Sequence, residues 1–398
     1  MMQVTEAKAS VVEAVEGRAD QLVGVSHSIW DSPELCFDEV HAHDLLCDTL
    51  EAEGLAVERG AYGLPTAFRA EAGTEGPTVA VCLEYDALPG IGHACGHNVI
   101  AAAGLGAGLA AASLADQLGG RVVILGTPAE EGGGGKVMMI ERGAFEGIDA
   151  AMMVHPADED LESFVAIAIQ ELTCAYHGKV AHAAAVPQAG INALDAAVLG
   201  YMAVAALRQH IESHERIHGI FTRGGDKPNL VPELATMLWY VRSGTSDSLA
   251  RLEPRVIAAL EAGALATGCT FEFDRSAPAY SDLIDNHRLV AAYVANLADR
   301  GRHPAPKETR PSFIGSTDMG NVSHEVPSIH PMIGVAPAGV AIHTPDFADH
   351  ARSERGDRAV VDGAIGMART IVDLWTDPNL LAAVRDEFHH APRSPVAG

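Results

Sequence analysis

Short apolar runs alternate with helical segments along the first part of the chain. Three mostly apolar runs, each bounded by polar residues or glycine, predict buried strands over 78–83, 121–126 and 150–154. Apolar spacing close to the helical period predicts helices over 8–28, 36–54, 99–118 and 137–142. Strands that alternate with helices are typical of a mainly parallel sheet with helices on both faces. We therefore expect an α/β fold here.

The pattern changes after about residue 166. Strands are predicted over 166–179, 217–223, 234–242 and 270–274, and helices over 191–210 and 246–267. The resulting order, β-α-β-β-α-β, is ferredoxin-like. Helix–strand alternation then resumes, with a helix over 287–300, and the tail from about Pro392 is expected to be disordered. The simplest account is a small α+β domain, 167–281, inserted into a discontinuous domain made of 1–166 and 282–398.

Composition narrows the class of protein further. A chain of 398 residues is too long for one ordinary core, which agrees with two domains. Its formal net charge of −26 repels nucleic acid and anionic membranes, so we expect neither as a partner. The N-terminus lacks the basic start and apolar core of a signal peptide. Six scattered cysteines without a CxxC pair suit a reducing compartment, so a cytoplasmic location is expected.

Side chains that bind metal ions gather where the predicted strands end, which is where α/β sheets bind ligands. The candidate ligands are Cys95, His97, Glu131, His155 and His343. Thiol, imidazole and carboxylate groups suit a borderline-soft divalent ion, with zinc the first expectation and manganese or cobalt the alternatives. Five ligands exceed what one four-coordinate ion needs, so two ions per subunit fit better. His93 is a further candidate, and the identity of the bridging ligand stays open.

The spacing of these residues indicates how the site is arranged. Cys95 and His97 are two residues apart, which in an extended segment places both side chains on one face. Adjacent residues at a strand end point to opposite sides, so we assign Glu131 to metal binding and Glu130 to general-base catalysis. Asp86, just upstream, either orients a ligand histidine or caps a turn, and the sequence leaves both roles open.

Two motifs carry a resemblance to a known family: EYDALPGIGHACGHN at 84–98 and GSTDMGNVS at 315–323. With the ligand set, they resemble the metallopeptidase family of aminoacylase-1, carboxypeptidase G and succinyl-diaminopimelate desuccinylase. The resemblance covers nearly the whole chain. It is strongest to the branch of auxin-conjugate hydrolases, aminobenzoyl-glutamate hydrolase and β-alanyl-lysine dipeptidase-like proteins. It implies a catalytic domain with a mainly parallel sheet and an inserted ferredoxin-like domain that serves as lid and dimer contact.

The resemblance also implies roles for individual residues. It implies metal binding by the five candidate ligands and a general-base role for Glu130. His182 matches a histidine that reaches a substrate carbonyl or carboxylate, and Asn229 and Arg242 match positions that bind the substrate carboxylate. A homodimer is implied as well. The chain departs from the auxin-conjugate members, which usually have Asp in place of Asn98 and Glu-Asp-Phe at 317–319, and this weakens the case for an auxin-type substrate.

The sequence therefore predicts a metal-dependent hydrolase that cleaves the amide bond of a small N-acyl amino acid or dipeptide. Water would attack the carbonyl carbon while Glu130 handles the proton. Deamination, or another specialised C–N hydrolysis on the same site, is one alternative. A second alternative is a non-catalytic metal-binding or scaffold protein. A third alternative is a cysteine hydrolase with Cys95 as nucleophile and His97 as base. Two residues this close on one short segment have a poor geometry for such a pair.

Overall fold

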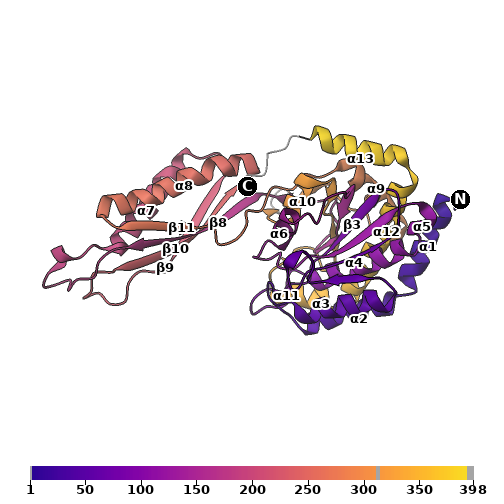
Figure 1. Cartoon of the computed structure of the whole chain (residues 1–398), viewed down its shortest axis with the longest axis horizontal. Helices are drawn as coiled ribbons and strands as arrows, with labels where there is room; N and C mark the ends of the chain where they lie inside the picture. Colours follow the sequence, from indigo (N-terminus) through magenta and orange to yellow (C-terminus); the bar gives the residue numbers. More distant parts are fainter. Residues whose placement is uncertain (1, 311–313, 392–398) are drawn as a thin grey trace. The chain divides into compact units, whose positions relative to one another are not determined.

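The described chain forms two compact units. The structure is a computed structural model that describes residues 2–310 and 314–391, and the expected disorder from Pro392 lies outside these residues. The large unit consists of residues 2–165 and 283–391 of the described chain, and the inserted unit consists of residues 166–282. In Figure 1 the inserted unit runs from magenta to orange, and the large unit takes the colours on either side.

A six-stranded sheet forms the centre of the large unit. Its strand order is β1 (Val57–Arg59), β2 (Phe68–Ala72), β4 (Arg121–Gly126), β3 (Thr78–Leu83), β5 (Ala150–Met152) and β13 (Ser328–Ile329). The four strands from β4 to β13 are parallel, whereas β1 and β2 pair antiparallel at one edge. The expectation of a mainly parallel sheet in an α/β fold is confirmed, and the antiparallel edge is an addition to it.

The register of β3 and β4 fixes where the following loops begin. Both strands are almost entirely buried and apolar, as expected for parallel strands covered on both faces. Leu83 pairs with Gly126 at their carboxyl ends. The Thr127 backbone N–H then donates to the Leu83 carbonyl at 2.8 Å, which extends the ladder by one bond. The segments that begin at Glu84 and Thr127 therefore leave the sheet at the same level.

Shorter strands continue this architecture. β6 (His155–Ala157) pairs in parallel with β14 (Met332–Gly334), and β7 (Val165–Ala166) pairs with β12 (Ile314–Gly315). β6 and β14 follow β5 and β13 after two-residue breaks. His155 therefore begins a second short strand, whereas the sequence predicted it at the tip of the first.

The helices of the large unit pack on its sheet and on one another. They are α1 (Val4–Glu16), α2 (Ala19–Asp31), α3 (Val40–Ala52), α4 (His97–Ala112), α5 (Ala115–Leu118), α6 (Gly135–Glu141), α9 (His287–Leu297), α10 (Met319–Glu325), α11 (Pro345–Ala351), α12 (Glu354–Thr376) and α13 (Pro378–His390). The prediction of single helices over 8–28 and 99–118 was wrong, because each is two helices. Among the helices of the described residues, none has both the length and the apolar character needed to cross a bilayer.

Helix α4 is buried almost along its whole length. Its small residues allow this close packing: a Cβ atom on Gly108 would lie 2.5 Å from Ile124 Cδ1 on β4. The helix is apolar all round, which is typical of a helix enclosed in a protein interior. Because α4 begins at His97, this packing also fixes the position of His97, one of the candidate ligands.

The inserted unit has the predicted ferredoxin-like order. Its elements are β8 (Ala168–His177), α7 (Ala193–Leu207), β9 (Arg216–Arg223), β10 (Leu234–Ser243), α8 (Ser246–Thr267) and β11 (Thr270–Asp274). The antiparallel sheet has the order β11-β8-β10-β9, with α7 and α8 on one face (Figure 1). Alternate residues of β8 and β10 are buried, and Tyr176 and Trp239 are the largest side chains in this core.

Candidate metal centre and active site

The candidate ligands of the large unit meet at the carboxyl edge of its parallel strands. Glu84 and Asp86 follow β3, Glu130 and Glu131 follow β4, and His155 follows β5. This edge is where open α/β sheets bind ligands. The chain therefore brings together side chains from three separate strand ends, as the sequence predicted, with Cys95 and His97 added at the start of α4.

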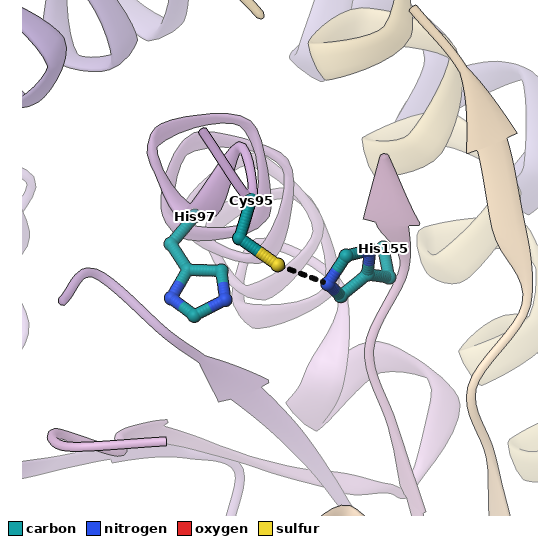
Figure 2. Close-up of side chains that lie close together, drawn as sticks. All are labelled: Cys95, His97 and His155. Carbon is teal, nitrogen blue, oxygen red and sulfur yellow. Dashed lines mark hydrogen bonds between the residues drawn. The ribbon is translucent and has the colours of Figure 1, made fainter. Parts of the chain in front are cut away.

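A left-handed turn at Gly96 places Cys95 and His97. Gly96 has φ 79°, and a Cβ atom there would lie 2.5 Å from Pro156 Cγ, so both the conformation and the space require glycine. The expectation of an extended segment was wrong, since His97 already belongs to the first turn of α4. Both side chains nevertheless face the same site, where Cys95 Sγ lies 3.3 Å from His155 Nε2 (Figure 2).

One nitrogen of His97 is oriented by Asp86 and the other faces the site. His97 Nδ1 lies 2.9 Å from Asp86 Oδ1. His97 Nε2 is buried and finds no hydrogen-bond partner within the described chain. Burial lowers the pKa of His97, but the charges of Asp86 and Cys95 outweigh this and raise it well above its usual value. Burial alone would raise the pKa of Asp86, but the charge of His97 and its hydrogen bond outweigh burial and lower the pKa of Asp86 to about 2.

The two adjacent glutamates face one site and not opposite sides, which corrects the expectation from strand geometry. Glu130 Oε2 and Glu131 Oε1 each lie 3.9 Å from His97 Nε2. Ala129, directly before them, has φ 59°, so the chain has already left the strand conformation. Glu131 Oε1 also lies 3.4 Å from Nε2 of the half-exposed His343.

The surroundings drive the pKa values of the two glutamates apart. Burial, together with the charges of Glu84 and Glu131, raises the pKa of Glu130 well above its usual value. Burial also raises the pKa of Glu131, but its contacts with His343 and His97 outweigh this and lower it. Such a split is typical of neighbouring carboxyl groups with different chemical roles.

Three sets of side chains offer ligand atoms within 4.8 Å of one another: Cys95, His97 and His155; Cys95, Glu131 and His343; Glu84, His97 and Glu130. The first two sets share Cys95 and together contain the five residues expected as ligands. Buried atoms without a hydrogen-bond partner among the described residues, namely His97 Nε2 and Glu84 Oε2, also face this region. The residues present therefore fit a divalent metal ion. His93 is buried but belongs to none of the three sets.

The protonation of Cys95 bears on the cysteine-hydrolase alternative. Burial, and then the charge of Glu131, raise the pKa of the Cys95 thiol well above its usual value. A cysteine nucleophile needs the thiolate, which this environment disfavours. A bound divalent cation, in contrast, stabilises a coordinating thiolate. The surroundings of Cys95 suit a metal ligand better than a nucleophile.

A buried ion cluster beside the site was not identified from the sequence. Lys136 Nζ lies 2.6 Å from Glu84 Oε1 and 2.7 Å from Asp318 Oδ1, and all three residues are completely buried. Asp318 Oδ2 also accepts the Lys136 backbone N–H at 2.9 Å, at the start of α6. The signal available in the sequence was a lone lysine directly after a run of glycines between buried segments, since a buried lysine needs countercharges.

The candidate substrate-binding residues of the inserted unit lie in two places. His182 Nδ1 accepts the backbone N–H groups of Ala184 and Ala185 at 3.3 and 3.2 Å. The Ala183 N–H donates to the Asn229 carbonyl at 3.0 Å, so the loops that carry His182 and Asn229 are joined. Arg242 instead lies on β10, with its guanidinium carbon 5.7 Å from the centre of the Tyr240 ring.

Hydrolysis at a metal centre requires ligands for the ion and a further carboxylate that handles the proton. The carboxyl edge of this sheet offers both, which defines a metal-dependent hydrolase. The chain belongs to the peptidase family M20/M25/M40, whose family model matches residues 80–360. Members of this family that resemble the chain include dipeptidases and amidohydrolases, so the protein is a hydrolase that acts on amide bonds.

The relatives that match nearly the whole chain include the following two. A Xaa-Arg dipeptidase of Mus musculus is 39% identical, over 96% of this chain and 92% of the relative. One of the subunits of the p-aminobenzoyl-glutamate hydrolase of Escherichia coli is 28% identical, over 94% of this chain and 93% of the relative. The suspected family and its branch are confirmed.

Solved structures show the same fold at low identity. An aminobenzoyl-glutamate utilization protein of Klebsiella pneumoniae superposes with a TM-score of 0.75 at 18% identity, covering 92% of this chain and 98% of its own. A dinuclear metal-binding M20 peptidase of Bacillus subtilis superposes with a TM-score of 0.68 at 19% identity, covering 91% of this chain and 99% of its own.

The buried cluster predicts a large and pH-dependent effect of Lys136→Met. The variant leaves Glu84 and Asp318 without their cation, which we expect to destabilise the fold by about 3–5 kcal/mol near neutral pH. Burial, opposed by Lys136, raises the pKa of Asp318 from 3.8 to about 6, and loss of Lys136 raises it further. A group whose pKa is raised in the folded state costs stability as the pH rises through that pKa.

The stability deficit of Lys136→Met should therefore be smallest in acid and largest above pH 6. Calorimetric Tm values at about pH 5 and about pH 8 measure this difference. Lys8→Met is the matched control, because it breaks a partly exposed pair with Asp373 and should cost no more than about 1 kcal/mol. Equal deficits for the two variants would contradict the importance of the buried cluster.

Proposed function

We propose that this protein cleaves the amide bond of a dipeptide or N-acyl amino acid that has a free carboxylate, using two divalent ions per subunit. The observation that carries the proposal is that Cys95 belongs to two ligand sets beside Glu130, a glutamate with a raised pKa. The first ion would bind Cys95, His97 and His155, and the second would bind Cys95, Glu131 and His343. Zinc is the ion we expect, with manganese or cobalt as the alternatives.

Within this class we propose a dipeptide with a basic residue. The mouse relative, at 39% identity, is a Xaa-Arg dipeptidase. The formal net charge of −26 supports the same choice, because an acidic protein attracts cationic substrates and lowers the local concentration of anionic ones. The departures at Asn98 and Thr317 from the auxin-conjugate members point away from an auxin-type substrate.

In the proposed mechanism Glu130 moves the proton. Bound divalent ions supply polarisation of the scissile carbonyl and acidification of water. Glu130 takes the proton of the attacking water and delivers it to the departing amine, a role for which a carboxyl group with a raised pKa is suited. Asp86 holds His97 in one tautomer through its contact with Nδ1, so that Nε2 stays available to bind a metal ion.

His182, Asn229 and Arg242 would bind the substrate. His182 Nδ1 accepts two backbone N–H groups, which assigns the ring proton to Nε2 and makes that atom a donor. Such a donor suits a substrate carbonyl oxygen or carboxylate. Arg242 offers a planar guanidinium that can bind a carboxylate through two hydrogen bonds, and Asn229 adds an amide.

We further propose a homodimer formed through the inserted unit. Val198, Leu199 and Met202 form an apolar stripe on the exposed side of α7, at the spacing of one helix face. Strand β9 lies at the edge of its sheet and exposes Ile220 and Phe221. An exposed apolar face beside an open strand edge is typical of a protein–protein contact.

A reducing, cytoplasmic location is proposed from the six free cysteines.

Replacing each glutamate in turn tests the division of roles. Glu130→Gln should lower kcat by about 10²- to 10⁴-fold, because the amide cannot transfer the proton, while metal content stays at wild-type level. Glu131→Gln is the matched partner and should lose metal as well as activity. Steady-state kinetics and elemental analysis of the purified variants measure both properties. Loss of metal in Glu130→Gln alone would show that the two roles are reversed.

Product detection by mass spectrometry tests the reaction itself. The metal-loaded protein is incubated with N-acetyl and N-aroyl amino acids, aminobenzoyl-glutamate, and dipeptides with basic or neutral C-terminal residues. We expect release of free amino acid that a chelator abolishes, fastest for the basic dipeptides. Release of ammonia in place of an amino acid would indicate deamination. Silence across the panel would contradict the proposed substrate class.

The dimer is tested by Met202→Glu, which places a charge on the most exposed residue of the α7 stripe. We expect this variant to be a monomer in size-exclusion chromatography with light scattering, because a buried unpaired charge opposes association. Leu265→Glu is the control, since Leu265 is 78% exposed on α8 and should leave the dimer intact. A monomeric wild type, or a dimeric Met202→Glu, would contradict the proposed contact.

A further inference from the structure

The residue before the two glutamates has an unfavourable backbone conformation. Ala129 is completely buried and has φ 59°, a left-handed conformation that side chains with a Cβ atom rarely adopt. Such a conformation persists only where the surroundings hold it, and it often lies at functional sites. In this chain it sets the direction in which Glu130 and Glu131 leave the strand.

A buried glutamate far away in the sequence is hydrogen-bonded to this turn. Glu39 is completely buried, and its Oε1 accepts the Ala129 backbone N–H at 2.8 Å. Its Oε2 accepts the Thr66 hydroxyl at 2.8 Å, which fixes the carboxylate. On the other side, the Ala129 carbonyl accepts the N–H groups of Gly133 and Gly134 at 3.0 and 2.9 Å. Both peptide groups of Ala129 are therefore bonded.

The position of Glu39 at the start of α3 does not account for its side chain. Glu39 occupies the N-cap position of α3, but its carboxylate makes no capping hydrogen bond. Glu34 serves that helix instead, since its carboxylate accepts the N–H groups of His41 and Ala42 at 2.8 and 3.1 Å. The Glu39 carboxylate is thus directed to the turn that precedes the glutamates.

Neighbouring residues of the same segment also contact the site. Cys36 Sγ donates to Asp86 Oδ2 at 3.4 Å. Phe37 packs so closely on the turn that a Cβ atom on Gly133 would lie 2.4 Å from its ring. The segment 36–39 therefore contacts both the loop after β3 and the turn after β4.

We propose that Glu39 is a positioning residue for the reaction: it holds the left-handed turn at Ala129 and thereby orients Glu130 and Glu131. This inference rests on the proposed roles of those two glutamates. Glu39 lies outside the three ligand sets found among the described residues, so its effect would act through the backbone and not through direct contact with substrate or metal.

Four variants separate this role from a general loss of stability. Glu39→Ala removes the acceptor of the Ala129 N–H. Glu39→Gln keeps both bonds, because its carbonyl can accept from Ala129 while its amide donates to the Thr66 oxygen. Ala129→Gly, alone and combined with Glu39→Ala, lets the turn form without the steric cost of a Cβ atom. The kcat on the best substrate and the affinity for zinc are measured for each.

We expect Glu39→Ala to lower kcat by about 10- to 100-fold, the effect of a small misplacement of a catalytic group, and to weaken zinc binding. Glu39→Gln should stay near wild type, and Ala129→Gly should restore much of what Glu39→Ala loses. Wild-type kcat and zinc affinity in Glu39→Ala would overturn the proposal. Equal impairment in Glu39→Gln, with no recovery by Ala129→Gly, would overturn it too.

Two further measurements keep the outcome interpretable. Glu215→Ala is the matched control, because buried Glu215 likewise accepts a backbone N–H and a hydroxyl, from Glu212 and Ser248 at 2.8 Å each. It should lower Tm without changing kcat or zinc affinity. If Glu39→Ala does not fold, Thr66→Val replaces it. We expect this variant to lose less kcat than Glu39→Ala, and Ala129→Gly should again restore the loss. An unchanged kcat in Thr66→Val would overturn the proposal.

The proposed function and the positioning role can fail separately. A wild-type protein that hydrolyses no member of the substrate panel contradicts the function. Zinc affinity measured across the same variants then tests the positioning role of Glu39 even when no substrate is cleaved, because Glu131 is a proposed zinc ligand on the same turn.

Discussion

The parallel pairing of β3 with β4 is the constraint on which the site depends. Because Leu83 and Gly126 are level in the register, the segments after the two strands leave the sheet together. Asp86 then bonds to both sides of the site, accepting the Glu131 N–H through Oδ2 and facing His97 through Oδ1. A one-residue slip in this pairing would turn every side chain of the strand to the other face and would separate these groups.

Charge explains why this edge of the sheet suits a cation. Glu84, Asp86, Glu130, Glu131 and Asp318 are gathered in the protein interior or at its margin, and Lys136 is bonded to two of them. Burying carboxylates is costly unless they are paired or bind a metal ion. Burial and the acidic neighbours accordingly raise the pKa of Glu130. Bound divalent ions would therefore contribute to the stability of the large unit as well as to its chemistry.

Much of this arrangement could be predicted from the sequence. Hydrophobic periodicity gave the order of strands and helices, and strand ends placed Cys95, His97 and the glutamates at one edge. What could not be predicted depends on backbone geometry or long-range contact. The start of α4 at His97 and the common direction of Glu130 and Glu131 follow from single left-handed residues, Gly96 and Ala129. The pairing of Lys136 with Asp318 joins residues 182 positions apart, which no local pattern reveals.

The discontinuity of the large unit has a consequence for synthesis of the chain. The inserted unit is one continuous segment, 166–282, with its own core, so it can fold as soon as it has left the ribosome. The large unit must wait, since β13, His343 and the helix α12 that packs on α4 are all translated afterwards. During that interval β5 has an unpaired edge and Cys95, His97 and His155 are already present without His343. Until β13 and His343 have been made, the open edge of β5 is exposed to aggregation and the set of proposed metal ligands stays incomplete.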